Sequence, residues 1–175
     1  RAEAALAAAA DPASPVPSEV EGALLDREGK PSEARAAYEK AVSLSSRRSH
    51  VYYRLAQLTR PPGGADRDTN EKIAGLLERA VELGPEYANA LSYLAETQSD
   101  LGKPEAGVEL ASRAVKLEPN ESYHRMALAG ALWNARRPDE ALMVAQSALA
   151  VAEDDQARAR VQRFLDTAAR NRQVP

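Results

Sequence analysis

One short phrase recurs through the chain at a fixed spacing, and this recurrence constrains the fold more than any other feature. The phrase reads GKPSEARAAYEKAV, then GKPEAGVELASRAV, then RRPDEALMVAQSAL, with a blurred copy before the second. The alanine near its end recurs in steps of 39, 34 and 34 residues, at Ala41, Ala80, Ala114 and Ala148. A step of about 34 residues is the period of a unit built from two helices and a turn.

The composition agrees with a helical fold. Hydrophobic residues make up 44% of the chain, much of it alanine, whereas aromatic residues make up only 5%. Alanine favours helix and allows helices to approach closely, and runs of β-branched or aromatic residues, which favour strands, are scarce. We therefore expect an all-α protein.

Each copy of the phrase has the residues that a tight helix pair requires. Small residues stand where the paired helices would come closest, at Ala34, Gly107 and Ala141. A proline precedes each of them at the first position of the second helix, where the missing N–H costs nothing, at Pro31, Pro104 and Pro138. Pro85 and Pro119 follow the helices that they end.

This pattern resembles the tetratricopeptide repeat (TPR) family. The unit from Ala88 to Glu121 carries the family positions Leu91, Leu94, Ala95, Gly102, Gly107, Ala111, Ala114 and Pro119. The first unit carries Gly22, Leu25, Gly29, Ala34, Tyr38 and Ala41, and the fourth has Arg136 where the turn glycine usually stands. The resemblance implies a right-handed α-solenoid of helix–turn–helix (TPR) repeats with a C-terminal capping helix.

The pattern predicts the following organisation. Residues 1–17 form a helix end, over 1–10, and a proline-rich linker, and residues 18–155 form four hairpins, over 18–48, 49–87, 88–121 and 122–155. Ser18 and Glu21 form a capping box at the first hairpin. The second hairpin carries an inserted loop over 61–70, which we interpret as a surface excursion, with a partner contact as the alternative. Its helix then resumes at Glu71 under a cap from Asp68 or Thr69.

Residues 156–175 are expected to form the capping helix and a tail. One apolar stripe at helical spacing consists of Ala157, Val161, Phe164, Leu165 and Ala168. The opposite side carries Arg158, Gln162, Arg163 and Asp166, which suits a helix that closes an otherwise open stack.

Composition and motifs give no indication of catalysis. The chain has no cysteine, so it has no disulfide and no thiolate metal site. Its two histidines, His50 and His124, belong to different units, and we expect both at the surface with no metal and no cofactor. No phosphate-binding glycine loop and no nucleophile motif are present. We therefore predict that the chain is not an enzyme.

Since no catalytic motif is present, we expect the chain to act through a binding surface. The resemblance implies a concave groove lined by the first helices of the repeats. The residues expected to face it are His50, Tyr53, Gln57, Asn89, Tyr93, Glu96, Tyr123, Met126, Trp133 and Asn134. Aromatic residues with a polar group often anchor a bound peptide. For Trp133, the only tryptophan, two interpretations stay open: an anchor in the groove, or packing between repeats or under the C-terminal helix.

The expected partner is a protein or peptide bound in this groove. A net charge of −3 argues against nucleic acid, and the longest apolar run, Ala4–Ala10, is too short to enter a membrane as a span. Some TPR domains clamp a chaperone's C-terminal carboxylate with basic residues. At the corresponding positions the chain has Glu19, Ala23, Tyr53, Gln57, Ser92 and Glu96, so no such clamp is expected.

Two other functions are weighed against this one. The chain starts at Arg1, not methionine, and then has a linker-like stretch, which would suit an accessory or tethering segment of a larger, enzymatic protein. The second alternative function is self-assembly through the ends of the stack, but the polar C-terminal helix favours a monomer. Frequent alanine and arginine indicate a GC-rich bacterial source. We expect a soluble protein, and nothing in the sequence identifies its compartment.

Overall fold

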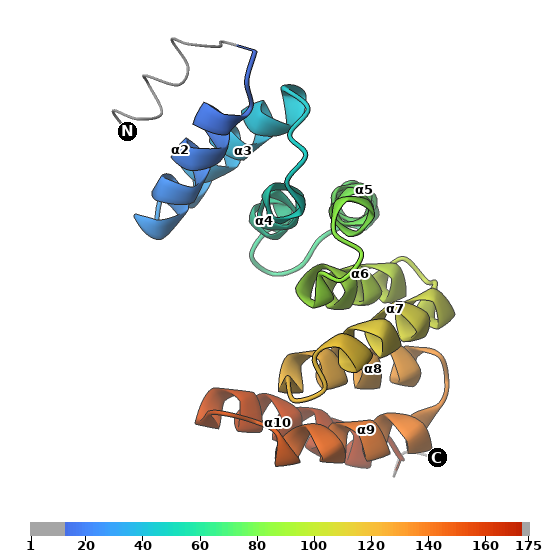
Figure 1. The fold of residues 1–175 in the computed structure, drawn as a ribbon. Helices are drawn as coiled ribbons and strands as arrows, with labels where there is room; N and C mark the ends of the chain where they lie inside the picture. Colours follow the sequence, from blue (N-terminus) through green and yellow to red (C-terminus); the bar gives the residue numbers. More distant parts are fainter. Residues whose placement is uncertain (1–12, 173–175) are drawn as a thin grey trace. The chain divides into compact units, whose positions relative to one another are not determined.

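A computed structural model describes residues 13–172, and every regular element in that range is a helix (Figure 1). The helices are α2 (Val16–Arg27), α3 (Pro31–Ser43), α4 (Ser49–Thr59), α5 (Arg67–Leu83), α6 (Ala88–Asp100), α7 (Pro104–Leu117), α8 (Ser122–Asn134), α9 (Pro138–Ala150) and α10 (Asp155–Arg172). The helix expected over 1–10 and the tail from 173 onward lie outside the described residues. The prediction of an all-α protein is confirmed.

The chain divides into two compact units, with the boundary between Pro85 and Glu86. In the first unit α2 packs on α3, α3 on α4, and α4 on α5. In the second unit α6 packs on α7 and α8, α7 on α8, and α8 on α9, while α10 packs mainly on α9. Helices adjacent in sequence thus pair as hairpins, and each unit holds two hairpins of the predicted repeat.

The core consists of small and aliphatic side chains contributed by facing helices. In the first unit the core cluster comprises Leu25, Ala34, Ala37, Tyr38, Ala41, Val51 and Leu55. In the second unit Ala95, Ala111 and Ala127 form one cluster, and Ala129, Ala145, Ala148 and Val161 form another. Val161 belongs to α10, where Ala157 and Ala168 are also buried, so the predicted apolar stripe does cover the last hairpin.

The predicted close approach of paired helices is confirmed at the small positions. A Cβ atom on Gly107 of α7 would lie 2.6 Å from Ser99 Oγ and 2.8 Å from the backbone oxygen of Ala95, both on α6. Ala34 and Ala141 are fully buried at the corresponding positions of α3 and α9. Only hydrogen or methyl side chains fit where the helices meet so closely.

The short turns inside three of the hairpins share one backbone conformation. Gly29, Gly102 and Arg136 have φ angles of 71°, 79° and 62°, which lie in the left-handed region. Glycine adopts this region without strain, whereas a residue with a Cβ does not. Arg136 therefore holds a backbone conformation that the other two hairpins assign to glycine.

Two predicted helix starts are wrong. Ser18 and Glu21 do not form a capping box, because α2 begins at Val16 and Ser18 is buried inside its first turn. Pro17 near the start of the helix makes this possible, since its missing N–H needs no partner there. Likewise α5 begins at Arg67 rather than Glu71, capped by Asp66, whose Oδ1 accepts the Thr69 N–H at 2.8 Å.

Candidate functional site

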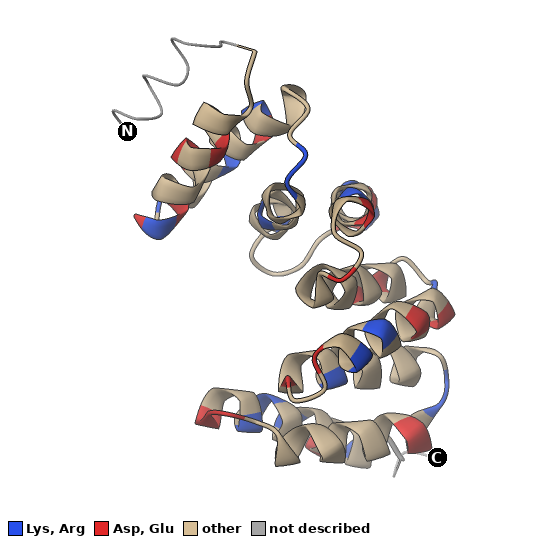
Figure 2. Cartoon of the chain, viewed as in Figure 1, with Lys and Arg blue, Asp and Glu red and all other residues tan. Residues whose placement is uncertain are grey.

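Charged residues are interspersed over the helices of both units. Both signs of charge occur on α2, α3, α5, α7 and α10, whereas α4, α6, α8 and α9 each carry charges of one sign (Figure 2). No group of three or more His, Asp or Glu side chains in residues 13–172 is arranged to hold a metal ion. Within the same residues, no helix is both long and apolar enough to cross a membrane.

The ten residues predicted to face a groove all lie on first helices of the hairpins. His50, Tyr53 and Gln57 are on α4 of the first unit. The other seven are on α6 and α8 of the second unit: Asn89, Tyr93, Glu96, Tyr123, Met126, Trp133 and Asn134. That they act together as a binding groove stays a prediction.

The structure brings three of these residues together around one hollow between α6 and α8. Glu96, Met126 and Asn134 line it, and its volume is about 140 Å³. The remaining lining residues are Ser99, Asp100, Ala127, Gly130 and Ala131. Ala127 and Ala131 are each only 2% exposed, and a Cβ atom built on Gly130 would meet nothing within 4 Å. Small side chains on α8 therefore create the hollow, and Gly130 leaves its middle open.

The edges of this α6–α8 hollow offer contacts for a peptide. Met126 is half-buried and contributes an adaptable apolar side chain. Asn134 is exposed, and its carboxamide has no hydrogen-bond partner among residues 13–172. A carboxamide can donate to a peptide carbonyl and accept from a peptide N–H at the same time.

On α4, Tyr53 and Gln57 are already engaged with each other. Gln57 Nε2 donates to the Tyr53 hydroxyl at 2.8 Å, and Arg54 donates to Gln57 Oε1. Arg54 also pairs with Asp26 of α2, with Nε 2.7 Å from Oδ2. These hydrogen bonds link α4 to α2 through Arg54 and Asp26, so a ligand there would meet side chains that are already positioned.

His50 and Tyr93 differ in their access to solvent. His50 is exposed at the start of α4, as predicted. Partial loss of hydration lowers the pKa of His50, and the positive charge of Arg48 lowers it further. Tyr93 is only 7% exposed, so the expectation that it faces an open groove is wrong. The reason is that α6 is buried on every side over residues 90–95.

Trp133 packs against the C-terminal helix, which is one of the two interpretations left open by the sequence. Its ring meets Phe164 of α10 edge-on, with centroids 5.9 Å apart. The indole is nevertheless half-exposed and lines a second pocket, of about 400 Å³, with Arg136, Pro138 and Asn171. From the sequence, Arg136 was recognisable only as the residue that replaces the usual turn glycine. No sequence feature indicated this pocket.

His124 is not a surface residue, and this prediction is wrong. Its ring is fully buried, with Nδ1 2.8 Å from Ser92 Oγ and Nε2 3.1 Å from Glu118 Oε2. In a neutral ring Nε2–H donates to the carboxylate and Nδ1 accepts from the Ser92 hydroxyl, whereas in a protonated ring Nδ1–H would donate to Ser92 Oγ. A Ser–His–acid order is also found in hydrolases, but a nucleophile must reach its substrate. Ser92 is 0% exposed, so this cluster joins α6 to α8 rather than forming an active site.

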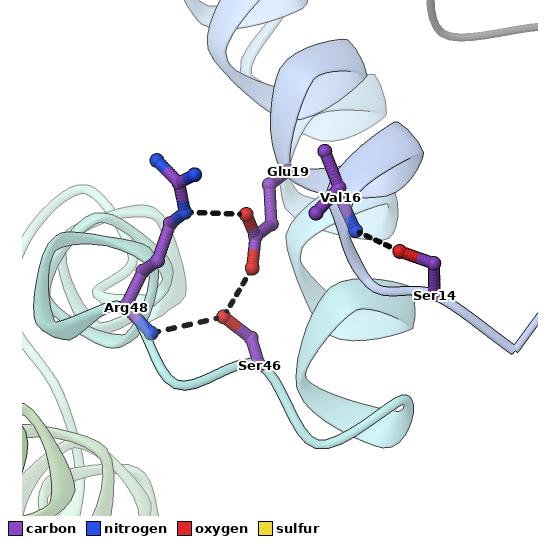
Figure 3. A network of polar contacts seen from close by, with 5 residues as sticks. All are labelled: Ser14, Val16, Glu19, Ser46 and Arg48. Atoms are coloured by element: carbon purple, nitrogen blue, oxygen red, sulfur yellow. Dashed lines mark hydrogen bonds and ion pairs between the residues drawn. The ribbon is translucent and has the colours of Figure 1, made fainter. Parts of the chain in front are cut away.

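A second buried polar network lies in the first unit (Figure 3). Glu19 of α2 accepts from Ser46 Oγ at 2.6 Å and from Arg48 Nε at 2.9 Å. Ser46 is 1% exposed, although it belongs to the polar stretch SSRRSH between α3 and α4. The network ties α2 to the loop that leads into α4, and explains why the acidic Glu19 can be buried.

The first unit also has a hollow of its own, between α3, α4 and α5. Its volume is about 360 Å³. Leu55 and Leu76 supply apolar lining, and Gly75 leaves it open, since a Cβ atom there would meet nothing within 4 Å. The charged side chains of Arg35, Glu39 and Lys72 also line it.

These hairpins define a helical-repeat protein, and comparison with solved structures identifies the repeat. YrrB, described as a TPR protein with an unusual peptide-binding site, superimposes with a TM-score of 0.71 at 22% identity, over 97% of this chain and 83% of that one. TTC0263, a thermophilic TPR protein of Thermus thermophilus, gives a TM-score of 0.68 at 22% identity, over 93% of this chain and 87% of that one.

A structure of MamA is similar to the chain at the same level, with a TM-score of 0.68, 21% identity, and coverage of 86% of this chain and 85% of that one. No protein-family model matches the sequence, and no curated protein matches it either. The chain thus has the TPR fold, an all-α fold of helical repeats, and it is similar to these proteins in fold alone. The fold predicted from the repeat spacing is confirmed.

Proposed function

We propose that the chain is a non-catalytic interaction module that binds a peptide segment of a protein partner across α6 and α8. The observation that carries this proposal is the α6–α8 hollow, which lies between the first helices of two successive repeats. The TPR fold supports an interaction scaffold, and one protein with a similar fold, YrrB, is described as having a peptide-binding site.

The hollow has the properties that a peptide requires. Buried Ala127 and Ala131 form a rigid floor, so little conformational entropy is lost on the receptor side. Gly130 lets a peptide backbone approach the helix closely, and the free carboxamide of Asn134 is available to bond that backbone. Met126 provides the apolar contact.

Gly130→Gln tests the proposal because it fills the hollow without disturbing the core. A side chain at this position has open space, and glutamine is a better helix former than glycine, so the domain should stay folded. Gly75→Gln is the matched control, since Gly75 is also a helical glycine with open space, but lies in the other unit.

The measurement is capture of partners from a native extract, followed by affinity for the captured segment as a synthetic peptide. We expect the parent and Gly75→Gln to bind that peptide with equal affinity. Gly130→Gln should bind it roughly tenfold or more weakly, because one or two good contacts are lost. Equal binding by Gly130→Gln would refute the α6–α8 site. If only Gly75→Gln loses affinity for the peptide, the binding site is the hollow of the first unit instead.

A further inference from the structure

The turn between α8 and α9 departs from the corresponding turns inside two other hairpins, although Ser45 between α3 and α4 also has a positive φ, of 60°. Its left-handed position, with φ of 62°, is held by Arg136, whereas Gly29 and Gly102 hold the same conformation elsewhere. A Cβ atom in this region strains the backbone. Strained residues of this kind cluster at sites that bind ligands, where the side chain has a role in binding.

The side chain of Arg136 is not used inside the fold. It is exposed, and its guanidinium makes no ion pair or hydrogen bond with any residue from 13 to 172. The next residue shows the contrast, because Arg137 bonds Glu140 through two nitrogens, at 2.7 and 2.8 Å, and lies 3.6 Å from Glu105. A guanidinium left unpaired beside a pocket is available to an external anion.

The pocket around Arg136 combines this charge with an apolar wall. Trp133 and Pro138 line it together with Arg136 and Asn171, and its volume is about 400 Å³. The indole is fixed from behind by the edge-on contact with Phe164, so its exposed part is a rigid surface. Rigid aromatic surfaces next to an arginine are typical of the residues that dominate peptide binding.

We propose that this Trp133 pocket binds an acidic peptide segment in which a carboxylate side chain adjoins an apolar one. Arg136 takes the carboxylate through its planar fork, and Trp133 with Pro138 takes the apolar side chain. A carboxylate fits better than a phosphate, because one guanidinium balances one negative charge and the chain as a whole carries a net charge of −3. The proposal uses residues outside the α6–α8 hollow and does not depend on it.

Trp133 provides its own assay, since it is the only tryptophan in the chain. The probe is the peptide Gly-Ser-Phe-Glu-Gly-Ser, acetylated and amidated at its ends, titrated while indole fluorescence is followed. The control peptide has Gln in place of Glu. We expect a saturable change with the Glu peptide and affinity for the Gln peptide weaker by roughly tenfold or more, because a charge-assisted hydrogen bond is lost.

Arg136→Gly separates binding from folding. Glycine suits the left-handed turn, so the thermal midpoint should rise while binding of the Glu peptide falls to that of the Gln peptide. Arg163→Ala removes an exposed arginine of α10 outside the pocket lining and should bind as the parent does. Gly130→Gln should also bind this probe normally, which keeps a failure of this proposal distinct from a failure of the α6–α8 site.

Four results would overturn the assignment. Equal affinity for the Glu and Gln peptides would remove the role of the carboxylate. Undiminished binding by Arg136→Gly would remove the role of the guanidinium. Tighter binding of the same peptide with phosphoserine in place of Glu would make the ligand a phosphopeptide, and improved binding with a free C-terminus would make it a terminal carboxylate.

Discussion

The two glycines at Gly107 and Gly130 should respond to the same substitution with opposite signs. Both lie inside helices of the second unit, α7 and α8. At Gly107 a Cβ atom would come within 2.6 Å of Ser99 Oγ and 2.8 Å of the Ala95 backbone oxygen. At Gly130 it would meet nothing within 4 Å. The substitution to alanine thus adds one methyl group to a tight helix contact in one case and to an open hollow in the other.

The magnitudes follow from two opposing terms. Alanine in place of glycine inside a helix raises the free energy of unfolding by about 0.5–1 kcal/mol. Gly130→Ala should show this gain alone. Gly107→Ala adds an overpacking cost of about 1–3 kcal/mol, since the backbone oxygen of Ala95 cannot rotate away as a side chain would. The net effect at Gly107 is a loss of up to about 2.5 kcal/mol.

Urea denaturation followed by helical circular dichroism measures both values. The dependence of the unfolding free energy on urea should stay constant, so that a shift in midpoint reports stability. Gly75→Ala on α5 is a control with open space and should match Gly130→Ala in sign. If Gly107→Ala also stabilises the protein, the contact between α6 and α7 is not limiting, and the reason given for a small residue at this repeat position is incorrect.

Three further predictions concern polar groups. Glu19→Ala should lower the free energy of unfolding by about 1–3 kcal/mol, measured in urea, because the buried Ser46 hydroxyl loses its acceptor. Ser92→Ala should cost a similar amount, about 1–3 kcal/mol, because it removes the donor to buried His124, and Ser147→Ala on the half-buried side of α9 is the milder comparison. Hydrogen bonds from the Thr69 hydroxyl and amide lower the pKa of Asp66 below its ordinary 3.8, so its contribution to stability is present above that value and is lost as the pH falls through the lower, folded-state pKa. Asp66→Asn keeps a cap that does not titrate, and its thermal midpoint should depend less on pH below about 4.

The repeat spacing was enough to predict the helices, because the packing positions recur with it. Ala34, Gly107 and Ala141 are each confined by a neighbouring helix, and the prolines that precede them start their helices as predicted. The starts of α2 and α5 were misplaced, because several residues near each start have the chemistry of a cap. Only the backbone path decides that Asp66 caps α5 while Ser18 lies inside α2.

The buried polar residues could not be predicted from one sequence. His124 is buried because Ser92, a whole repeat earlier, and Glu118, in the preceding loop, both reach its ring. Neither partner stands at a spacing that helical periodicity would single out. Arg136 was visible as an exception to the turn glycine, but its unpaired guanidinium and the pocket beside it depend on where α10 packs.

The repeat itself separates residues that maintain the fold from residues that are free to act. In the first helix of three repeats a leucine is followed by an alanine, which recurs as Ala56, Ala95 and Ala129. All three alanines are 0% exposed, because any larger side chain would push the helix pair apart. The residue directly after it differs each time, as Gln57, Glu96 and Gly130, and is half-buried in each case. Packing requires the first position to be constant and leaves the second unconstrained. Gly130, at this unconstrained position, and Arg136, in place of a turn glycine, are therefore where binding is best sought.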